Sequence, residues 1–188
     1  MITVQNNFLD QKYFKELQTI LTSADTPWHF HDGVNNIKDG HYMMGHCLYK
    51  NNIPTSSLYN KFIGLFEKMD ISCLLRSKLN LYFKTEKVIE HGFHMDVEDN
   101  FKNLRTSIFY INTNNGYTKF ENGRLFKSEE NTLITFPNYL KHSGSTNTCE
   151  SPTRIVLNVS YFFIFKVFTY NAHATTEYLS PFVTGLTL

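Results

Sequence analysis

The sequence predicts an α+β fold in which two N-terminal helices precede a β-rich core. Three observations favour this class: two segments with apolar residues at helical spacing, a run of short period-two segments after Ile71, and turn signals between those segments. Helices followed by many short antiparallel strands indicate a closed or sandwiched β unit. At 188 residues the chain fits one domain with a substantial core.

The two predicted helices each have a capping residue and one apolar face. Asp10 can cap the first, whose apolar positions are Tyr13, Phe14, Leu17, Ile20 and Leu21. The second follows Pro54, and Ser56 or Ser57 can cap it. Its apolar positions are Leu58, Phe62, Leu65, Phe66 and Met69. We expect both faces to cover the back of a sheet.

Residues 28–49, between the helices, are polar, punctuated by glycine and rich in histidine. Their weak periodicity predicts a loop with short strands. Four histidines lie here, at positions 29, 31, 41 and 46, and could in principle form a metal group. Without a tight ligand spacing they are more typical of polar loop residues near a substrate.

The strand signals after residue 71 are short and separated by turns. They cover residues 79–84, 107–112, 118–120, 132–136 and 154–162. The Asn-Gly pairs at 115–116 and 122–123 predict hairpin turns, and the Pro-Asn pair at 137–138 predicts another turn.

Composition and charge exclude several classes of protein. Lysine plus arginine (18) nearly balances aspartate plus glutamate (17), so nucleic acid is neither favoured nor excluded as a partner. Three cysteines without a CxxC pattern indicate reduced thiols. The N-terminus lacks a signal-peptide pattern, and the most apolar window, residues 155–168, is shorter than the roughly 20 residues that span a bilayer. We expect a cytoplasmic protein without a membrane segment, and the oligomeric state stays open.

The stretch HGFHMD, residues 91–96, carries the strongest chemical signal. In a strand, residues i and i+2 face the same side, so His94 and Asp96 could present a nitrogen and an oxygen to one point. His142, after a strand and a proline turn, could supply a third ligand. Two imidazoles and one carboxylate suit non-haem iron(II) with open coordination positions. His91 has the wrong parity to join them, and we expect it beside the site or in solvent.

Arg154 is an anomaly at the start of a core-like strand, residues 154–162. A buried carboxylate from a ligand would explain it, because a guanidinium can bind a carboxylate through two hydrogen bonds. Asn158 lies on the same face of that strand and could line a pocket or satisfy the core.

The joint order of these motifs resembles the iron(II)- and 2-oxoglutarate-dependent oxygenases, nearest the prolyl 4-hydroxylase-like branch. The resemblance covers about residues 79–163, through HxD, YIN, NNGYTKF, TFPNYLKH and RIVLNVSYF. It implies a double-stranded β-helix, or jelly roll, with the N-terminal helices packed on the outside of one sheet. We expect a single oxygenase domain, residues 1–188, with a helical part at about 8–70, a β-helix core at about 76–163 and a tail at 164–188 without an assigned role.

The resemblance assigns the iron to His94, Asp96 and His142. It implies that Arg154 binds the distal carboxylate of the cosubstrate 2-oxoglutarate, and that the hydroxyl of Tyr110 joins it. Three further residues are candidates for the cosubstrate pocket: Tyr82, Asn80 and Asn158. The alternatives for Asn80 are a polar contact on the side of a turn or a contact that supports the metal ligands, and the alternative for Asn158 is a polar contact inside the core.

The activity implied is hydroxylation of an unactivated C–H bond, coupled to decarboxylation of 2-oxoglutarate to succinate, with ascorbate as a stimulant. A peptidyl proline or other protein side chain leads as substrate, a small metabolite follows, and a nucleobase comes third. Prolyl hydroxylases often carry a double glycine where this chain has Asn115-Gly116, so prolyl specificity stays open. The competing classes are a noncatalytic metal-binding jelly roll, serving as a sensor or structural module, and a zinc hydrolase.

Overall fold

A computed structural model describes residues 1–35, 39–98, 101 and 103–163 of the 188-residue chain. The strands are β1 (Thr3–Gln5), β2 (His29–His31), β3 (Met43–Lys50), β4 (Ile53–Pro54), β5 (Cys73–Phe83), β6 (Leu104–Tyr110), β7 (Tyr117–Phe120), β8 (Leu125–Lys127), β9 (Thr132–Pro137), β10 (His142–Gly144) and β11 (Thr153–Phe162). The tail predicted at 164–188 lies outside the described residues, and the assignment of the whole chain to one domain stays a prediction.

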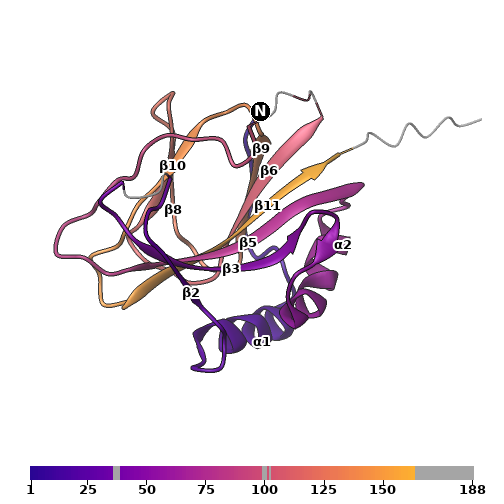
Figure 1. Cartoon of the computed structure of the whole chain (residues 1–188), viewed down its shortest axis with the longest axis horizontal. Helices are drawn as coiled ribbons and strands as arrows, with labels where there is room; N and C mark the ends of the chain where they lie inside the picture. Colours follow the sequence, from indigo (N-terminus) through magenta and orange to yellow (C-terminus); the bar gives the residue numbers. More distant parts are fainter. Residues whose placement is uncertain (36–38, 99–100, 102, 164–188) are drawn as a thin grey trace, which may run out of the picture.

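The strands form two antiparallel sheets (Figure 1). The main sheet has the order β1-β9-β6-β11-β5-β3-β2, with β4 paired to β3, and the minor sheet has the order β10-β7-β8. An apolar cluster lies between the sheets and includes Ile108, Phe120, Ile134, Phe136 and Val156. The two sheets therefore enclose a core of their own, as a jelly roll requires.

The helices lie on the outer face of the main sheet (Figure 1). Helix α1 (Gln11–Thr22) begins at Asp10, whose carboxylate accepts hydrogen bonds from the backbone N–H groups of residues 12 and 13. Ser56 caps the second helical segment, which starts as a 3₁₀ turn, η1 (Ser57–Phe62), and continues as α2 (Ile63–Lys68). Their buried side chains pack with the outward-facing residues of β5, β6 and β11: Phe14, Leu17, Leu21, Phe62, Leu65, Leu79, Phe109 and Leu157.

Strand alternation decides which side chains reach the interior between the sheets. On β5, Leu79 and Leu81 belong to the helix-facing cluster, whereas Tyr82 belongs to the cluster between the sheets. On β11, Leu157 faces the helices and Val156 faces the interior. Every polar residue two positions from Tyr82 or Val156 along these strands therefore points into the jelly roll.

Two sequence predictions were wrong in instructive ways. Residues 28–49 were predicted to be a loop with short strands, but residues 43–50 form β3, an eight-residue strand paired with β5. Because residues on both faces of β3 are buried, the strand shows little alternation. The Asn-Gly pair at 115–116 makes no hairpin; it lies on the connection from β6 in the main sheet to β7 in the minor sheet.

Close packing explains the glycine at that connection. A Cβ at Gly116 would lie 2.6 Å from Cδ of Arg154 and 2.9 Å from the carbonyl oxygen of Thr146. The hairpin expected at 122–123 does join β7 to β8, with Gly123 at a φ of +84°. The turn predicted at 137–138 is present, with the Leu140 N–H donating to the Pro137 carbonyl.

The sequence also predicted reduced cysteines and no membrane segment. Cys47, Cys73 and Cys149 are free thiols. Across the described ranges, every helix is too short or too polar to cross a bilayer.

Candidate metal centre

The HGFHMD segment does not form the strand that the sequence suggested. It lies in the connection between β5 and β6 and touches the minor sheet through an isolated bridge that pairs His94 with His142 on β10. These two residues exchange both backbone hydrogen bonds, each 3.0 Å long. Their ring centroids are 4.7 Å apart. The imidazoles of His94 and His142 therefore come together through pairing with β10, and not because alternate residues of one strand face the same side.

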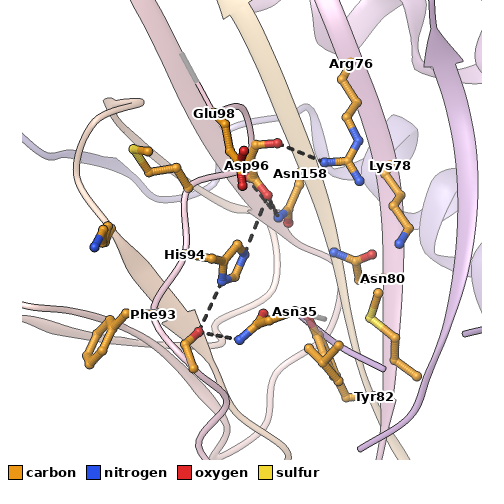
Figure 2. A pocket seen from close by; sticks show the side chains of 15 residues that line it. Asn35, Arg76, Lys78, Asn80, Tyr82, Phe93, His94, Asp96, Glu98 and Asn158 are labelled. Atoms are coloured by element: carbon orange, nitrogen blue, oxygen red, sulfur yellow. Dashed lines mark hydrogen bonds and ion pairs between the residues drawn. The ribbon is translucent and has the colours of Figure 1, made fainter. Parts of the chain in front are cut away.

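His94, Asp96 and His142 converge on one point. One potential ligand atom from each lies within 4.8 Å of the other two, which no other such group in the described part of the chain achieves. The Asp96 carboxylate is 3.8 Å from Nε2 of His94 and 3.7 Å from Nε2 of His142. Figure 2 shows His94 and Asp96 facing each other across the pocket. Two nitrogens and one carboxylate oxygen match the donor set of a facial triad.

Hydrogen bonding and burial leave both Nε2 atoms ready to bind a cation. Nδ1 of His94 is 3.2 Å from the Gly92 carbonyl oxygen. Because a carbonyl can only accept, Nδ1 carries the proton and Nε2 keeps its lone pair. His142 is 2% exposed, and burial lowers its pKa to about 4, so its ring is neutral at pH 7. Nε2 of His142 has no hydrogen-bond partner among the described residues.

The Asp96 carboxylate is held from the main sheet. Nδ2 of Asn158, on β11, donates to both carboxylate oxygens at 3.2 Å, and Arg76, on β5, donates to the Asp96 carbonyl oxygen at 3.2 Å. Burial raises the pKa of the Asp96 carboxyl, but the two imidazoles, Arg76 and the Asn158 amide together hold it below its usual value. The carboxylate is therefore ionised and oriented before any cation arrives.

Arg154 lies deep between the sheets. It is 1% exposed; Nε donates to Ser128 Oγ at 2.7 Å and Nη2 donates to Thr118 Oγ1 at 3.1 Å. The guanidinium also lies over the rings of Tyr82 and Tyr110, 5.5 and 5.8 Å from their centroids. No carboxylate among the described residues pairs with it. Since arginine stays protonated, the site holds a buried positive charge that lacks an anion.

A cavity connects the arginine to the metal-ligand candidates. A wide part of about 460 Å³ is lined by His94, Asp96 and Asn80, and a narrow part of about 20 Å³ is lined by His142 and Arg154. Both parts share three lining residues: Tyr82, His94 and Asn158. The His-Asp-His group therefore lies where a wide chamber meets a narrow recess that ends at a guanidinium.

Of the two tyrosines predicted near the cosubstrate, Tyr82 lines this recess, and Tyr110 contacts the Arg154 guanidinium without lining the recess. Burial raises the pKa of Tyr82 and of Tyr110 to about 12, so both hydroxyls stay protonated and can donate hydrogen bonds. The Tyr110 hydroxyl donates to the Phe126 carbonyl at 3.4 Å. Asn80 is buried, lines the wide chamber, and its Oδ1 has no partner among the described residues.

The remaining histidines do not join the group. His91 is buried, not in solvent, and stacks on Tyr82 with 5.3 Å between ring centroids. Sequence reasoning missed Arg76 and Lys78, which line the wide chamber. The signal was available: both share the strand face of Asn80 and Tyr82, at a spacing of two residues.

No protein-family model matches the chain, and no curated protein sequence matches it. Solved structures do match. A Pseudomonas putida prolyl-4-hydroxylase aligns with a TM-score of 0.62 at 11% identity, covering 86% of this chain and 92% of that one. A 2OG-Fe(II) oxygenase family oxidoreductase from Burkholderia pseudomallei gives a TM-score of 0.61 at 15% identity, with 86% and 84% covered.

A Trichoplax adhaerens prolyl hydroxylase, solved in complex with a peptide fragment of the hypoxia inducible factor, gives a TM-score of 0.61 at 13% identity, with 86% of this chain and 83% of that chain covered. The likeness shows the fold. The resemblance to the 2-oxoglutarate-dependent oxygenases is thus confirmed at the level of fold, prolyl hydroxylases are among the matching structures, and the predicted jelly roll is correct.

Proposed function

We propose that this chain is an iron(II)- and 2-oxoglutarate-dependent dioxygenase that hydroxylates an unactivated C–H bond and converts 2-oxoglutarate to succinate. One observation carries the proposal: a fully buried guanidinium without an anionic partner among the described residues opens, through a shared cavity, onto a His-Asp-His group. A noncatalytic metal module has no need of such a guanidinium, whereas a dicarboxylate cosubstrate does.

The residues present fit the implied metal. His94 and His142 would bind iron(II) through Nε2, and Asp96 through its carboxylate, because these atoms converge and the Nε2 of buried His142 is otherwise unsatisfied. When bound, iron(II) would activate dioxygen, the oxidant, while 2-oxoglutarate supplies two electrons and is decarboxylated to succinate and carbon dioxide. Asn158 would keep the carboxylate of Asp96 in place through its two hydrogen bonds.

The recess would position the cosubstrate. Arg154 would hold the distal carboxylate of 2-oxoglutarate, because its pairing with an anion would relieve the cost of the buried charge. Ser128 and Thr118 fix the guanidinium from one side, and Tyr82 and Tyr110 cover its faces. These groups bind and orient the cosubstrate, and neither tyrosine exchanges a proton at pH 7, since the pKa of each is about 12.

The substrate would enter the wide chamber of about 460 Å³. A protein or peptide side chain is the leading candidate, in line with the peptide-bound Trichoplax structure. A small molecule is the second, since a chamber of this size lies within the range of small-ligand pockets. The fold alone does not distinguish a peptide substrate from a small molecule. An α-ketoglutarate-dependent epimerase from nogalamycin biosynthesis also matches, with a TM-score of 0.61 at 12% identity.

Succinate formation tests the proposal. The full chain would be incubated in air with iron(II), ascorbate and 2-oxoglutarate, and succinate would be quantified against samples without iron. We expect iron-dependent succinate even without the substrate, through slow uncoupled turnover. Iron binding without any succinate would favour the noncatalytic module, and metal-dependent hydrolysis that ignores 2-oxoglutarate would favour the zinc hydrolase.

A further inference from the structure

One wall of the wide chamber is cationic. Arg76 and Lys78 project from β5 on the same face as Asn80 and Tyr82, and Figure 2 shows the Arg76 guanidinium bonded to the Asp96 segment. The β5–β11 register sets Lys78 beside Asn158 and Tyr82 beside Arg154. The wall thus begins at the recess for the cosubstrate and continues into the part of the chamber that a substrate would occupy.

Neither cation of this wall forms an ion pair among the described residues, although the charge of the Asp96 carboxylate acts on both. The Lys78 ammonium makes no hydrogen bond or ion pair there, and Arg76 makes only its bond to the Asp96 carbonyl oxygen. Of the other charged groups lining the chamber, Lys141 lies 3.9 Å from Glu121, and Glu98 is exposed to solvent. Once the Asp96 carboxylate binds a metal, positive charge exceeds negative charge on this wall.

The side chain of Lys78 is packed closely against β3. Its stem passes over Gly45 on β3, where an added Cβ would lie 2.7 Å from Cε of Lys78 and 2.6 Å from Nε2 of His31. Burial and, to a smaller extent, the charge of Arg76 lower the pKa of the Lys78 ammonium to about 8, although the Asp96 carboxylate opposes this shift. An ammonium that is partly desolvated and unpaired is unfavourable unless a bound anion compensates it.

We propose that Arg76 and Lys78 bind a carboxylate of the substrate, so that the molecule oxidised is a carboxylic acid or a peptide with an acidic side chain close to the oxidised carbon. This inference rests on the proposed function and names its substrate class. The amides of Asn35, Asn80 and Asn158 line the same chamber and suit the polar atoms of such a molecule. A bare proline ring would leave the Lys78 ammonium and the Oδ1 atoms of these three asparagines without a partner.

Binding measurements test the proposal without relying on turnover. The full chain, saturated with manganese(II) and 2-oxoglutarate, would be titrated calorimetrically with the twenty free L-amino acids and with their carboxamides. A parallel arm would use blocked tripeptides with a central aspartate or a central asparagine. We expect at least one acid to bind about tenfold or more tightly than its uncharged amide. The arm in which this happens identifies the source of the carboxylate.

Variants assign the effect to the wall. Lys78→Met should weaken binding of the acid about tenfold or more and leave the weak binding of its amide unaltered, whereas Lys12→Met, an exposed lysine of α1, should change neither. Lys78→Gln would replace the methionine variant if that variant did not fold. Acids that bind no better than amides in both arms, or acid binding that survives loss of Lys78, would overturn the inference.

The proposed function fails in a different way. It fails if the wild-type chain forms no succinate from 2-oxoglutarate. Binding of a carboxylate that depends on Lys78 can be measured in that case as well, on the manganese(II)-loaded chain. Succinate formation without any Lys78-dependent binding of an acid would leave the oxygenase intact and remove only the carboxylate subsite.

Discussion

Two buried histidines in this molecule differ in what their ring nitrogens do. His46, on β3, is 4% exposed; its Nδ1 is 2.7 Å from the Pro27 carbonyl oxygen and its Nε2 is 2.7 Å from Ser56 Oγ. His142, on β10, is 2% exposed, and its Nε2 has no hydrogen bond among the described residues. The first ring is satisfied by the protein itself, and the second is satisfied only when a ligand binds.

This difference separates a structural histidine from a candidate ligand more clearly than sequence spacing does. A buried polar atom without a partner costs about 1–3 kcal/mol, so one that lines a cavity, as His142 does, favours a ligand from outside the chain. Arg154 is the charged counterpart of this case, because its guanidinium is buried without an anion among the described residues. The unsatisfied groups thus outline the parts that iron(II) and 2-oxoglutarate would complete.

Replacing a ligand histidine is expected to have the largest effect. His94→Ala should abolish turnover of 2-oxoglutarate, with a loss of at least about 100-fold, because two ligands cannot hold iron(II) in the required geometry. Succinate formation measures the effect. His29→Ala, which changes an exposed histidine of β2, is the matched control and should retain turnover. Near-normal turnover by His94→Ala would remove this residue from the ligand set.

Replacing the buried arginine should come next. Arg154→Met should weaken binding of 2-oxoglutarate by about 2–5 kcal/mol, the usual cost of removing one partner from a buried charged pair. The dissociation constant measured without oxygen on the metal-loaded protein reports this directly. Arg124→Met, at the exposed hairpin after β7, serves as the control. An unchanged dissociation constant for Arg154→Met would place the cosubstrate elsewhere.

The sequence could predict these groups but not how they meet. Helix caps, strand alternation and the order of the motifs depend on neighbours in the chain, so Asp10, Ser56 and the inner face of β11 were predictable. The approach of His94 to His142 depends on a β-bridge between two residues that are 48 positions apart in the sequence. The spacing of apolar residues within one segment does not predict such a contact. The role of Gly116 was misread for the same reason, because its constraint comes from Arg154 and not from a turn.

The pH dependence of stability should reveal the unsatisfied ring in the metal-free protein. Burial lowers the pKa of His142 to about 4, whereas an unfolded histidine titrates near 6.5. Between these values the unfolded chain binds a proton that the folded chain does not, so stability is complete above about pH 6.5 and falls as the pH drops toward 4, by at most about 3 kcal/mol from this group.

Urea unfolding of the metal-free protein at pH 7.5 and at pH 5 measures this loss. Burial also lowers the pKa of His91 to about 4, so the loss has the same sign for both residues. His142→Phe should reduce the difference between the two pH values, leaving the part due to His91 and to His31, whose pKa burial also lowers. If His142→Phe kept the full difference, the ring of His142 would not be held neutral by burial.

The smallest expected effect is on stability, and it compares His46 with His142 directly. In the metal-free protein at pH 7.5, His46→Ala should cost about 1–3 kcal/mol of unfolding free energy, because it leaves the Ser56 hydroxyl and the Pro27 carbonyl without their partner. His142→Phe should cost less than about 1 kcal/mol, since a phenyl ring can keep the edge-to-face contact with Phe136, now at 5.0 Å, and removes an unsatisfied nitrogen. Chemical denaturation measures both. Equal losses would mean that His142, like His46, is held for the sake of the fold, and that stability alone would account for its place beside Asp96.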